Sequence, residues 1–198
     1  MKQIFEIKDK VIINSVLDRV EYGTLALSVD NVPYAVPVNF VRIEDTIYFH
    51  GALSNKKMKI LAKNPRVSFS VVEEYALIAS FFSSTEGLAC PATQFFKSVS
   101  IEGNVEIVEA RDEKAMMFEA LMKKLQPEGG YKPFSDDAYD KAIKSTAVMK
   151  IIPTEIRAKF KLGQHLDDQR FTMIVKHLEE RGTKIDRETV SLMREFRP

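Results

Sequence analysis

The sequence predicts a mainly β fold, in which antiparallel strands form a closed or split barrel with helices packed at its ends. Segments with alternating apolar and polar residues are joined by short turns such as Asp30-Asn31. Strands and helices do not alternate regularly, which disfavours a parallel sheet. About six antiparallel strands in this order fit a barrel.

The first elements are a helix and a hairpin. Residues 9–20 have Asp9 as a candidate N-cap and apolar residues at helical spacing. Residues 24–29 alternate and are rich in strand-forming residues, and the chain returns as a strand over 33–42. Pro33 and Pro37 lack an N–H group, so this strand should lie at an edge, or open where it meets something other than a strand.

A second group of elements follows the turn at Glu44-Asp45. We expect a strand at 46–51 and then a helix at 54–64, with Ser54 as its N-cap and Asn64-Pro65 as its stop. The alternating segment 66–72 predicts another strand.

Residues 73–96 contain no clear pattern and are interpreted as irregular. A long strand is expected at 97–109, followed by an amphipathic helix at 112–125. Acidic residues begin this helix and Lys123-Lys124 end it, which matches the helix dipole.

The last elements are a short helix, a strand and a helical tail. The remaining predictions are a helix at 135–144, a strand at 146–152 continuing through 156–163, a helix at 167–182 closed by Gly182, and a helix at 187–196 capped by Asp186. We expect one domain over 1–155 and an extension over 156–198 that packs on it or on a partner copy.

Composition narrows the function. The 198 residues contain 29 basic and 28 acidic side chains, and this balance argues against binding of nucleic acid. One cysteine excludes an internal disulfide framework, and with few histidines no metal site is expected. No apolar run could span a membrane, and a charged start does not resemble a signal peptide, so a cytoplasmic location is expected.

The densest group of reactive side chains lies at 48–57. His50 and Gly51 end a strand, and Lys56 and Lys57 fall in the first turn of the next helix, where cations oppose the helix dipole. A bound phosphate would remove this conflict; the alternative is a solvated helix start. His50 could be an acid, a ligand, a hydrogen-bond donor to the same phosphate, or a structural residue.

Three further patterns carry open alternatives. The proline-interrupted stretch 36–40 could offer backbone groups to a flat heterocycle, or form a bulged edge strand. Ser98 and Ser100 share one strand face, which could contact a ligand or water. Arg157, Lys159 and Lys161 also alternate, and could recruit an anionic substrate, an acidic partner or nothing.

Five motifs in order resemble a known family. They are GTLAL (23–27), PYAVPVNF (33–40), IYFHGALSNKKMKIL (47–61), NPRVSFSV (64–71) and FKSVSIEGNVEIVE (96–109). Together they resemble the flavin-binding split-barrel proteins related to pyridoxamine 5′-phosphate oxidase, most closely the branch that includes the 5-nitroimidazole-resistance proteins. The resemblance covers roughly residues 10–160.

The resemblance implies a six-stranded antiparallel split barrel that forms a homodimer, with one FMN in each of two clefts between the subunits. The residues implied at the isoalloxazine are Pro37, Val38, Asn39 and Phe40. Those implied at the phosphate are His50, Gly51, Ala52 and Lys57, with Lys56 assisting. Ser98 and Val99 match the family's Ser-Val pair in the cleft, and Asn55 stands where the family often has glycine.

The leading hypothesis is therefore an FMN-dependent oxidoreductase, reduced by NAD(P)H or another small donor and passing electrons to a small aromatic or nitro compound. His50 is the one candidate acid or base. The arginine-rich motifs of pyridoxamine 5′-phosphate oxidase are not matched, so that activity itself is not expected. The alternatives are a non-enzymatic flavin sensor and a split barrel that binds haem; some relatives bind F420.

Overall fold

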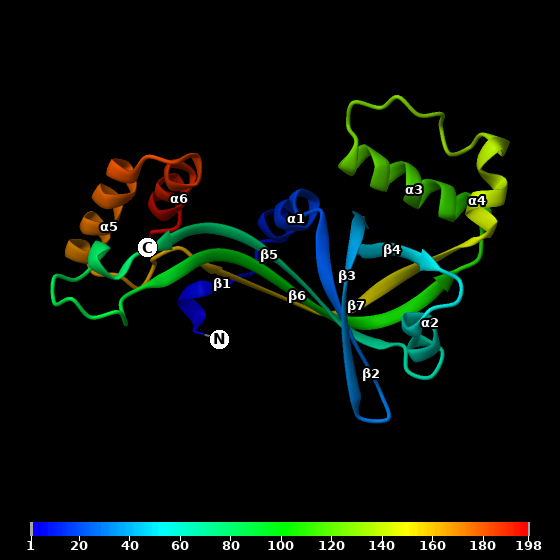
Figure 1. Ribbon diagram of the computed structural model, residues 1–198, viewed down its shortest axis with the longest axis horizontal. Helices are drawn as coiled ribbons and strands as arrows, with labels where there is room; N and C mark the ends of the chain where they lie inside the picture. Colours follow the sequence, from blue (N-terminus) through cyan, green and yellow to red (C-terminus); the bar gives the residue numbers. More distant parts are fainter. Residues whose placement is uncertain (1, 198) are drawn as a thin grey trace. The chain divides into compact units, whose positions relative to one another are not determined.

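The structure is a computed structural model that describes residues 2–197 (Figure 1). The strands are β1 (Glu6–Ile7), β2 (Tyr22–Val29), β3 (Val32–Ile43), β4 (Thr46–Ala52), β5 (Arg66–Ile78), β6 (Thr93–Val108) and β7 (Thr146–Lys161). The α-helices are α1 (Lys10–Arg19), α2 (Lys56–Leu61), α3 (Arg111–Leu125), α4 (Asp140–Lys144), α5 (Asp168–Arg181) and α6 (Lys184–Glu195). Short 3₁₀ helices are η1 (Gln3–Phe5), η2 (Ser80–Phe82) and η3 (Asp137–Tyr139).

The strands form one sheet that closes on itself. Their order is β1-β7-β4-β3-β2-β5-β6, and β6 also pairs with β7. Strands β2 to β7 therefore make a ring of six, and the two-residue strand β1 pairs antiparallel with β7. The predicted antiparallel barrel with flanking helices is confirmed, while β1 was not predicted.

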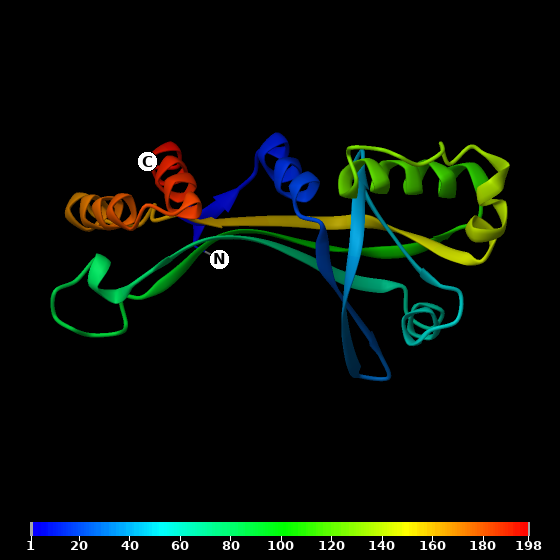
Figure 2. The ribbon, with the colours of Figure 1, turned by 45° about the horizontal axis from the view of Figure 1, so that its top comes forward.

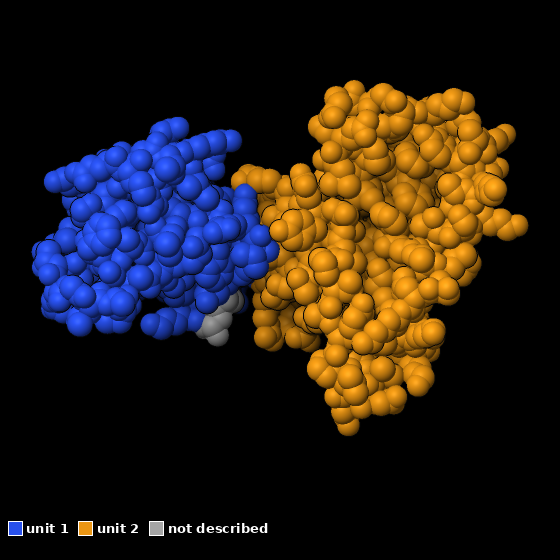
Figure 3. All heavy atoms as spheres, viewed as in Figure 1, with its two compact units in different colours: residues 1–9, 72–98, 158–198 blue, residues 10–71, 99–157 orange. Residues whose placement is uncertain are grey.

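The chain divides into two compact units (Figure 3). The ring unit consists of residues 10–71 and 99–157, and the tail unit consists of residues 1–9, 72–98 and 158–198. Strands β5, β6 and β7 contribute residues to both units.

The ring unit owes its core to strand alternation. In β2, Leu25 and Leu27 are buried while their neighbours are exposed, as a period of two requires. The predicted turn between β2 and β3 is present, because Asp30 and Asn31 adopt positive φ angles of 51° and 62°. The hairpin tip lies on the side opposite α3 (Figures 1 and 2). Buried side chains of α3 pack against β3, β4, β6 and β7.

The tail unit is held by two capped helices. Asp167 accepts a hydrogen bond from the Arg170 N–H at 2.8 Å to begin α5, and Gly182 ends it with a φ of 65°, as predicted. Helix α6 begins earlier than expected, because Thr183 rather than Asp186 is its N-cap. Asp186 instead completes a capping box from the third helical position.

Two strands are longer than the sequence predicts. Residues 73–78 continue β5 and residues 93–96 begin β6. Of the stretch interpreted as irregular, residues 79–92 form a loop, which contains the 3₁₀ helix η2. In β5, Tyr75 and Ala76 are both buried although they are consecutive, which hides the alternation. Within residues 2–197, no helix has the length and apolar character needed to cross a membrane.

Candidate flavin site

Strand β3 changes its pairing half way along. It pairs with β2 from Val32 to Asn39, and with β4 only from Phe40 to Ile43. Strand β3 as a whole lies between β2 and β4, so the first alternative, an edge strand, is wrong. The second alternative, a strand that is open along part of its length, is confirmed for residues 32–39. Both prolines lie in the half that has one strand neighbour, where a missing N–H costs no ladder bond on the open side. We call residues 32–39 the free half of β3.

Asn55 sets the start of α2. Its backbone is extended, its side-chain oxygen accepts from the Met58 N–H at 2.9 Å, and its side-chain nitrogen donates to the Ala52 carbonyl at 3.1 Å. The predicted N-cap, Ser54, is wrong, because the Asn55 amide satisfies groups on both sides of the turn. Helix α2 has only six residues, so side-chain charge rather than a helix dipole dominates this corner.

Lys57 is a buried cation with little compensation. Its residue is 7% exposed, and its Nζ donates to the His50 carbonyl at a long 3.4 Å and lies 5.2 Å from the Phe49 ring centroid. Among the described residues, no carboxylate lies within ion-pair distance of it. Burial lowers the pKa of Lys57. A buried ammonium group normally has a charged partner, and an anion bound at this corner would supply one.

Gly51 makes room for this lysine. A Cβ atom at this position would lie 3.0 Å from the Lys57 Nζ and 3.3 Å from the Asn55 side-chain nitrogen. A side chain at Gly51 would therefore force the Lys57 ammonium group to shift by a few tenths of an ångström. The absence of a side chain keeps the backbone of β4, Lys57 and the α2 cap in close contact.

Lys56 connects this corner to β3. Its Nζ lies 4.4 Å from the centroid of the Tyr34 ring, a cation–π distance, and Tyr34 belongs to the free half of β3. The structure thus brings together the two regions that the sequence marked separately: the cations after β4 and the unpaired stretch of β3.

His50 lies beside Lys57 as a neutral group. The residue is exposed overall, but its ring is packed 5.5 Å from the Phe118 ring, centroid to centroid. Partial burial lowers the pKa of His50, and the Lys57 ammonium group lowers it further. At neutral pH the imidazole is uncharged, so it can contribute a hydrogen bond but not a second full charge.

The other residues implied on β3 and β4 divide into two groups. Val38 and Phe40 are buried, and Phe40 packs against Phe69 at 5.0 Å between ring centroids, so only their backbone atoms can reach a ligand. Pro37 and Asn39 are exposed, as is Ala52 beside α2. The side chain of Asn39 donates to the Glu21 carbonyl at 3.1 Å.

The side chains of Ser98 and Val99 both make contacts within the chain. Val99 is fully buried in the core. Ser98 belongs to the tail unit, and its hydroxyl donates to the Lys159 carbonyl at 3.3 Å. Their role in a cleft stays a prediction.

Lys124 is a residue that the sequence interpretation missed. Its Nζ donates to the carbonyls of Leu17 at 2.9 Å and Phe40 at 3.2 Å, and lies 3.8 Å from the Phe40 ring centroid. Burial lowers the pKa of Lys124 to about 8. The phase of the amphipathic helix α3 was the one signal available, because it separates Lys124 from the exposed Lys123.

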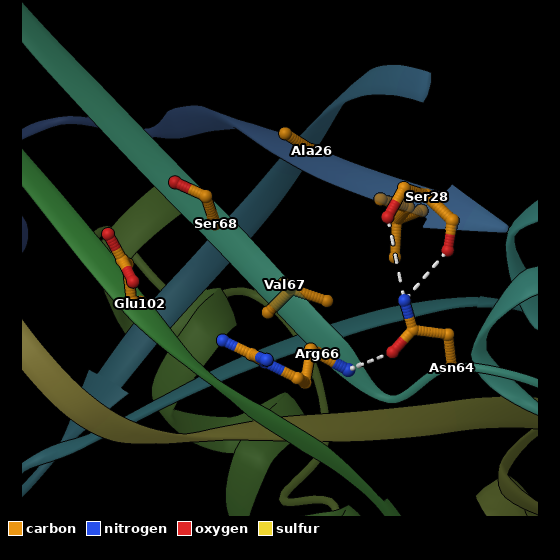
Figure 4. A pocket seen from close by; sticks show the side chains of 8 residues that line it. Ala26, Ser28, Asn64, Arg66, Val67, Ser68 and Glu102 are labelled. Atoms are coloured by element: carbon orange, nitrogen blue, oxygen red, sulfur yellow. Dashed lines mark hydrogen bonds between the residues drawn. The ribbon is translucent and has the colours of Figure 1, made fainter. Parts of the chain in front are cut away.

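A separate depression of about 380 Å³ lies on the ring unit, over β2, β5 and β6 (Figure 4). Asn64 donates to the Ser28 carbonyl at 2.9 Å and accepts from the Arg66 N–H at 3.1 Å. These hydrogen bonds connect Asn64 to β2 and to the first residue of β5, which indicates a structural role. In the part of the chain described, no cluster of three or more metal-ligating side chains occurs.

Comparison with known proteins agrees with this geometry. A family model described as pyridoxamine 5′-phosphate oxidase matches residues 9–160, which is more than half of the chain. No curated protein sequence matches it.

Three solved structures show the same fold. A candidate 5-nitroimidazole antibiotic resistance protein from Bacteroides thetaiotaomicron is 22% identical with a TM-score of 0.64, covering 78% of this chain and 85% of its own. The flavocytochrome Anf3 from Azotobacter vinelandii is 22% identical with a TM-score of 0.68, covering 85% and 76%. The FAD and haem binding protein from Mycobacterium smegmatis is 21% identical with a TM-score of 0.61, covering 79% and 73%.

The ring of six strands and the match over residues 9–160 lead to one conclusion. The chain belongs to the pyridoxamine 5′-phosphate oxidase family of split-barrel proteins.

Proposed function

We propose that this protein binds FMN and acts as a flavin-dependent oxidoreductase. The observation that carries the proposal is Lys57, a buried ammonium group with no carboxylate beside it among the described residues. The neighbouring Lys56 contacts Tyr34 in the free half of β3. In this proposal Lys57 holds the phosphate, with Lys56, Ala52 and the backbone at His50 and Gly51 around it. The backbone of residues 37–40 holds the edge of the isoalloxazine ring.

The residues present fit a phosphorylated ring compound. A phosphate supplies the charge that Lys57 lacks, and the gap that Gly51 leaves keeps the ammonium group aimed at this corner. One side of residues 32–39 lacks a strand, so backbone donors and acceptors are available for a flat heterocycle. The names of two similar structures, a flavocytochrome and an FAD and haem binding protein, support a flavin as the ligand class.

The flavin supplies hydride and single-electron chemistry when bound, and the protein supplies position and electrostatics. Lys57 and Lys56 fix the phosphate end, and the β3 backbone orients the ring. His50, held neutral, offers a hydrogen bond without adding charge. The electron donor in this proposal is NAD(P)H or another small reductant, and the acceptor is a small aromatic or nitro compound.

We further propose that the protein is a homodimer whose second copy completes the flavin site. The exposed large apolar side chains of the ring unit include Tyr22 (64% exposed), Val32 (58%) and Leu53 (54%). Tyr22 and Val32 lie on the β2–β3 hairpin, and Leu53 precedes α2. A second copy that covers this region would remove apolar surface from water beside the site.

The test begins with the purified full chain. We expect a flavin absorption spectrum, release of FMN identified by mass after denaturation, and a dimer by light scattering. Bleaching by NAD(P)H followed by reoxidation with a nitroaromatic compound would support the enzyme. Bleaching by dithionite but not by NAD(P)H would contradict the proposed enzyme and favour a non-enzymatic flavin sensor. A Soret band without a flavin band would overturn the proposed cofactor.

A further inference from the structure

The tail unit contains its own polar cavity of about 320 Å³. Lys161, His165 and Arg170 are among its lining residues, together with the hydroxyl groups of Ser83 and Thr93. All residues that line this tail cavity lie within residues 72–98 and 158–198, so it shares no residue with the corner formed by β4 and α2. None of its lining residues is acidic.

A rigid turn after β7 places Lys161 and His165. The buried side chain of Gln164 accepts from the Leu162 N–H and donates to the Phe160 carbonyl, both at 2.9 Å. Gly163 has a φ of 90°, and a Cβ atom there would lie 2.9 Å from the Leu166 side chain. The turn therefore demands glycine and fixes Lys161 on one side and His165 on the other.

Arg170 approaches the cavity from the first turn of α5. Its guanidinium group donates to the Ser83 hydroxyl at 3.5 Å. The two nearest acidic side chains in sequence are used elsewhere: Asp167 caps α5 through the backbone of Arg170, and Asp168 pairs with Arg197. Arg170 is thus left facing a hydroxyl group.

Lys161 and His165 likewise have no acidic partner among the described residues. Lys161 donates to the Thr93 hydroxyl, and the His165 ring packs edge-on against Phe5 at 5.4 Å between centroids. Among the described residues, no carboxylate lies within ion-pair distance of Lys161, His165 or Arg170. Burial lowers the pKa of both Lys161 and His165, and the surrounding cations lower them further.

Of the three alternating cations in the sequence, Lys161 is the one that reaches this cavity. Arg157 forms an ion pair with Glu155 at 2.7 Å, and Lys159 lies 5.4 Å from the centroid of the Phe96 ring. The strand pattern therefore does not form a general basic face. It supplies one lysine to a cavity in which the turn supplies His165 and α5 supplies Arg170.

We propose that the tail cavity binds a small organic phosphomonoester. Three basic side chains and two hydroxyl groups, from β6, β7, the turn, α5 and the loop before β6, suit the several oxygens and double negative charge of a phosphate better than a planar carboxylate. The volume exceeds that of a bare phosphate, and Ile78, Phe95 and Ile174 provide an apolar wall for an organic group.

Cys90 gives a direct reporter of occupancy, because it is the single cysteine of the chain and lines the same cavity. The experiment measures the alkylation rate of Cys90 by the neutral reagent N-ethylmaleimide in the full-length protein, at constant ionic strength. The probes are inorganic phosphate, glycerol 2-phosphate and acetate. At a probe concentration about ten times its dissociation constant, occupancy should slow alkylation by about tenfold.

The expected result is protection by glycerol 2-phosphate that exceeds protection by inorganic phosphate, with little protection by acetate. Arg170→Gln and Lys161→Gln should each abolish the protection, and Lys176→Gln, an exposed lysine of α5, should retain it. Arg170→Gln keeps the test decisive where Lys161→Gln fails to fold. Protection in a Lys57→Ala background should persist, which separates this site from the flavin proposal.

The proposal would be overturned by no protection by either phosphate, by equal protection by acetate, or by protection that survives Arg170→Gln in a folded protein. Stronger protection by inorganic phosphate than by glycerol 2-phosphate would also overturn it, since the apolar wall would then have no ligand to contact.

Discussion

The Lys57 Nζ lies 3.4 Å from the carbonyl oxygen of His50, and this long hydrogen bond is its one polar contact in the described residues. A buried ammonium group held by a single weak acceptor is poised to take an anion. This relationship joins the end of β4 to the start of α2 and underlies the predictions for flavin binding.

Replacement of Lys57 should weaken FMN binding. Lys57→Ala removes a charge-assisted hydrogen bond, which should cost about 1.5–3 kcal/mol, roughly a 10- to 150-fold rise in Kd. Fluorescence titration of the apoprotein with FMN measures this change. Lys59→Ala, an exposed lysine of the same helix, is the matched control and should bind as the native protein does. Equal affinities for Lys57→Ala and native protein would remove Lys57 from the site.

A methyl group at Gly51 should act through Lys57. Gly51→Ala places a Cβ atom 3.0 Å from the Lys57 Nζ, so the ammonium group must move and FMN affinity should fall. The thermal midpoint should change little, because the displaced atom is the end of a flexible side chain. In the Lys57→Ala background, Gly51→Ala should have no further effect on Kd, and additive losses would contradict this coupling.

Lys124 should make stability depend on pH in the alkaline range. Burial lowers its pKa from 10.5 to about 8 in the folded chain, so the unfolded chain binds more protons between these values. The free energy of unfolding should therefore rise with pH across this window. Urea unfolding of Lys124→Met should lack this rise, whereas Lys123→Met, whose side chain is 71% exposed, should keep it.

Asp186 should stabilise the helices of the tail unit. It is fully buried, accepts from Arg181 at 2.9 and 2.5 Å, and accepts from the Thr183 N–H at 3.1 Å. Asp186→Asn should cost about 3 kcal/mol, at the lower end for a broken buried pair because Arg181 can still reach water. Urea unfolding measures this loss, and Glu188→Gln, an exposed residue of α6, should change stability little.

The same carboxylate predicts sensitivity to acid. The Arg181 guanidinium group lowers the pKa of Asp186 from 3.8 to about 2. Because the folded pKa lies below the unfolded one, the contribution is present above about pH 4 and is lost as the pH falls towards 2. In urea unfolding, the difference in stability between native protein and Asp186→Asn should shrink over this range, and a constant difference would contradict it.

Local signals explain what could be predicted from the sequence. The Asp30-Asn31 turn and the Gly182 stop depend on a few neighbouring residues, and both were predicted correctly. At α2 and α6, two polar residues compete for the cap, and the winner depends on side-chain geometry, so Ser54 and Asp186 were wrong choices. The partners of Lys57 and Lys124 come from other elements, and sequence spacing does not report such contacts.

The contact between Lys124 and the Phe40 carbonyl has a consequence for β3. Phe40 is the first residue of β3 that pairs with β4, and Lys124 of α3 holds the chain at that residue. A hydrogen bond from α3 therefore fixes the residue at which the pairing of β3 with β4 begins. Without the hydrogen bond from Lys124, the pairing of β3 with β4 should open from Phe40 towards Ile43. Hydrogen exchange would then show earlier deuterium uptake at the amides of Val41 and Ile43.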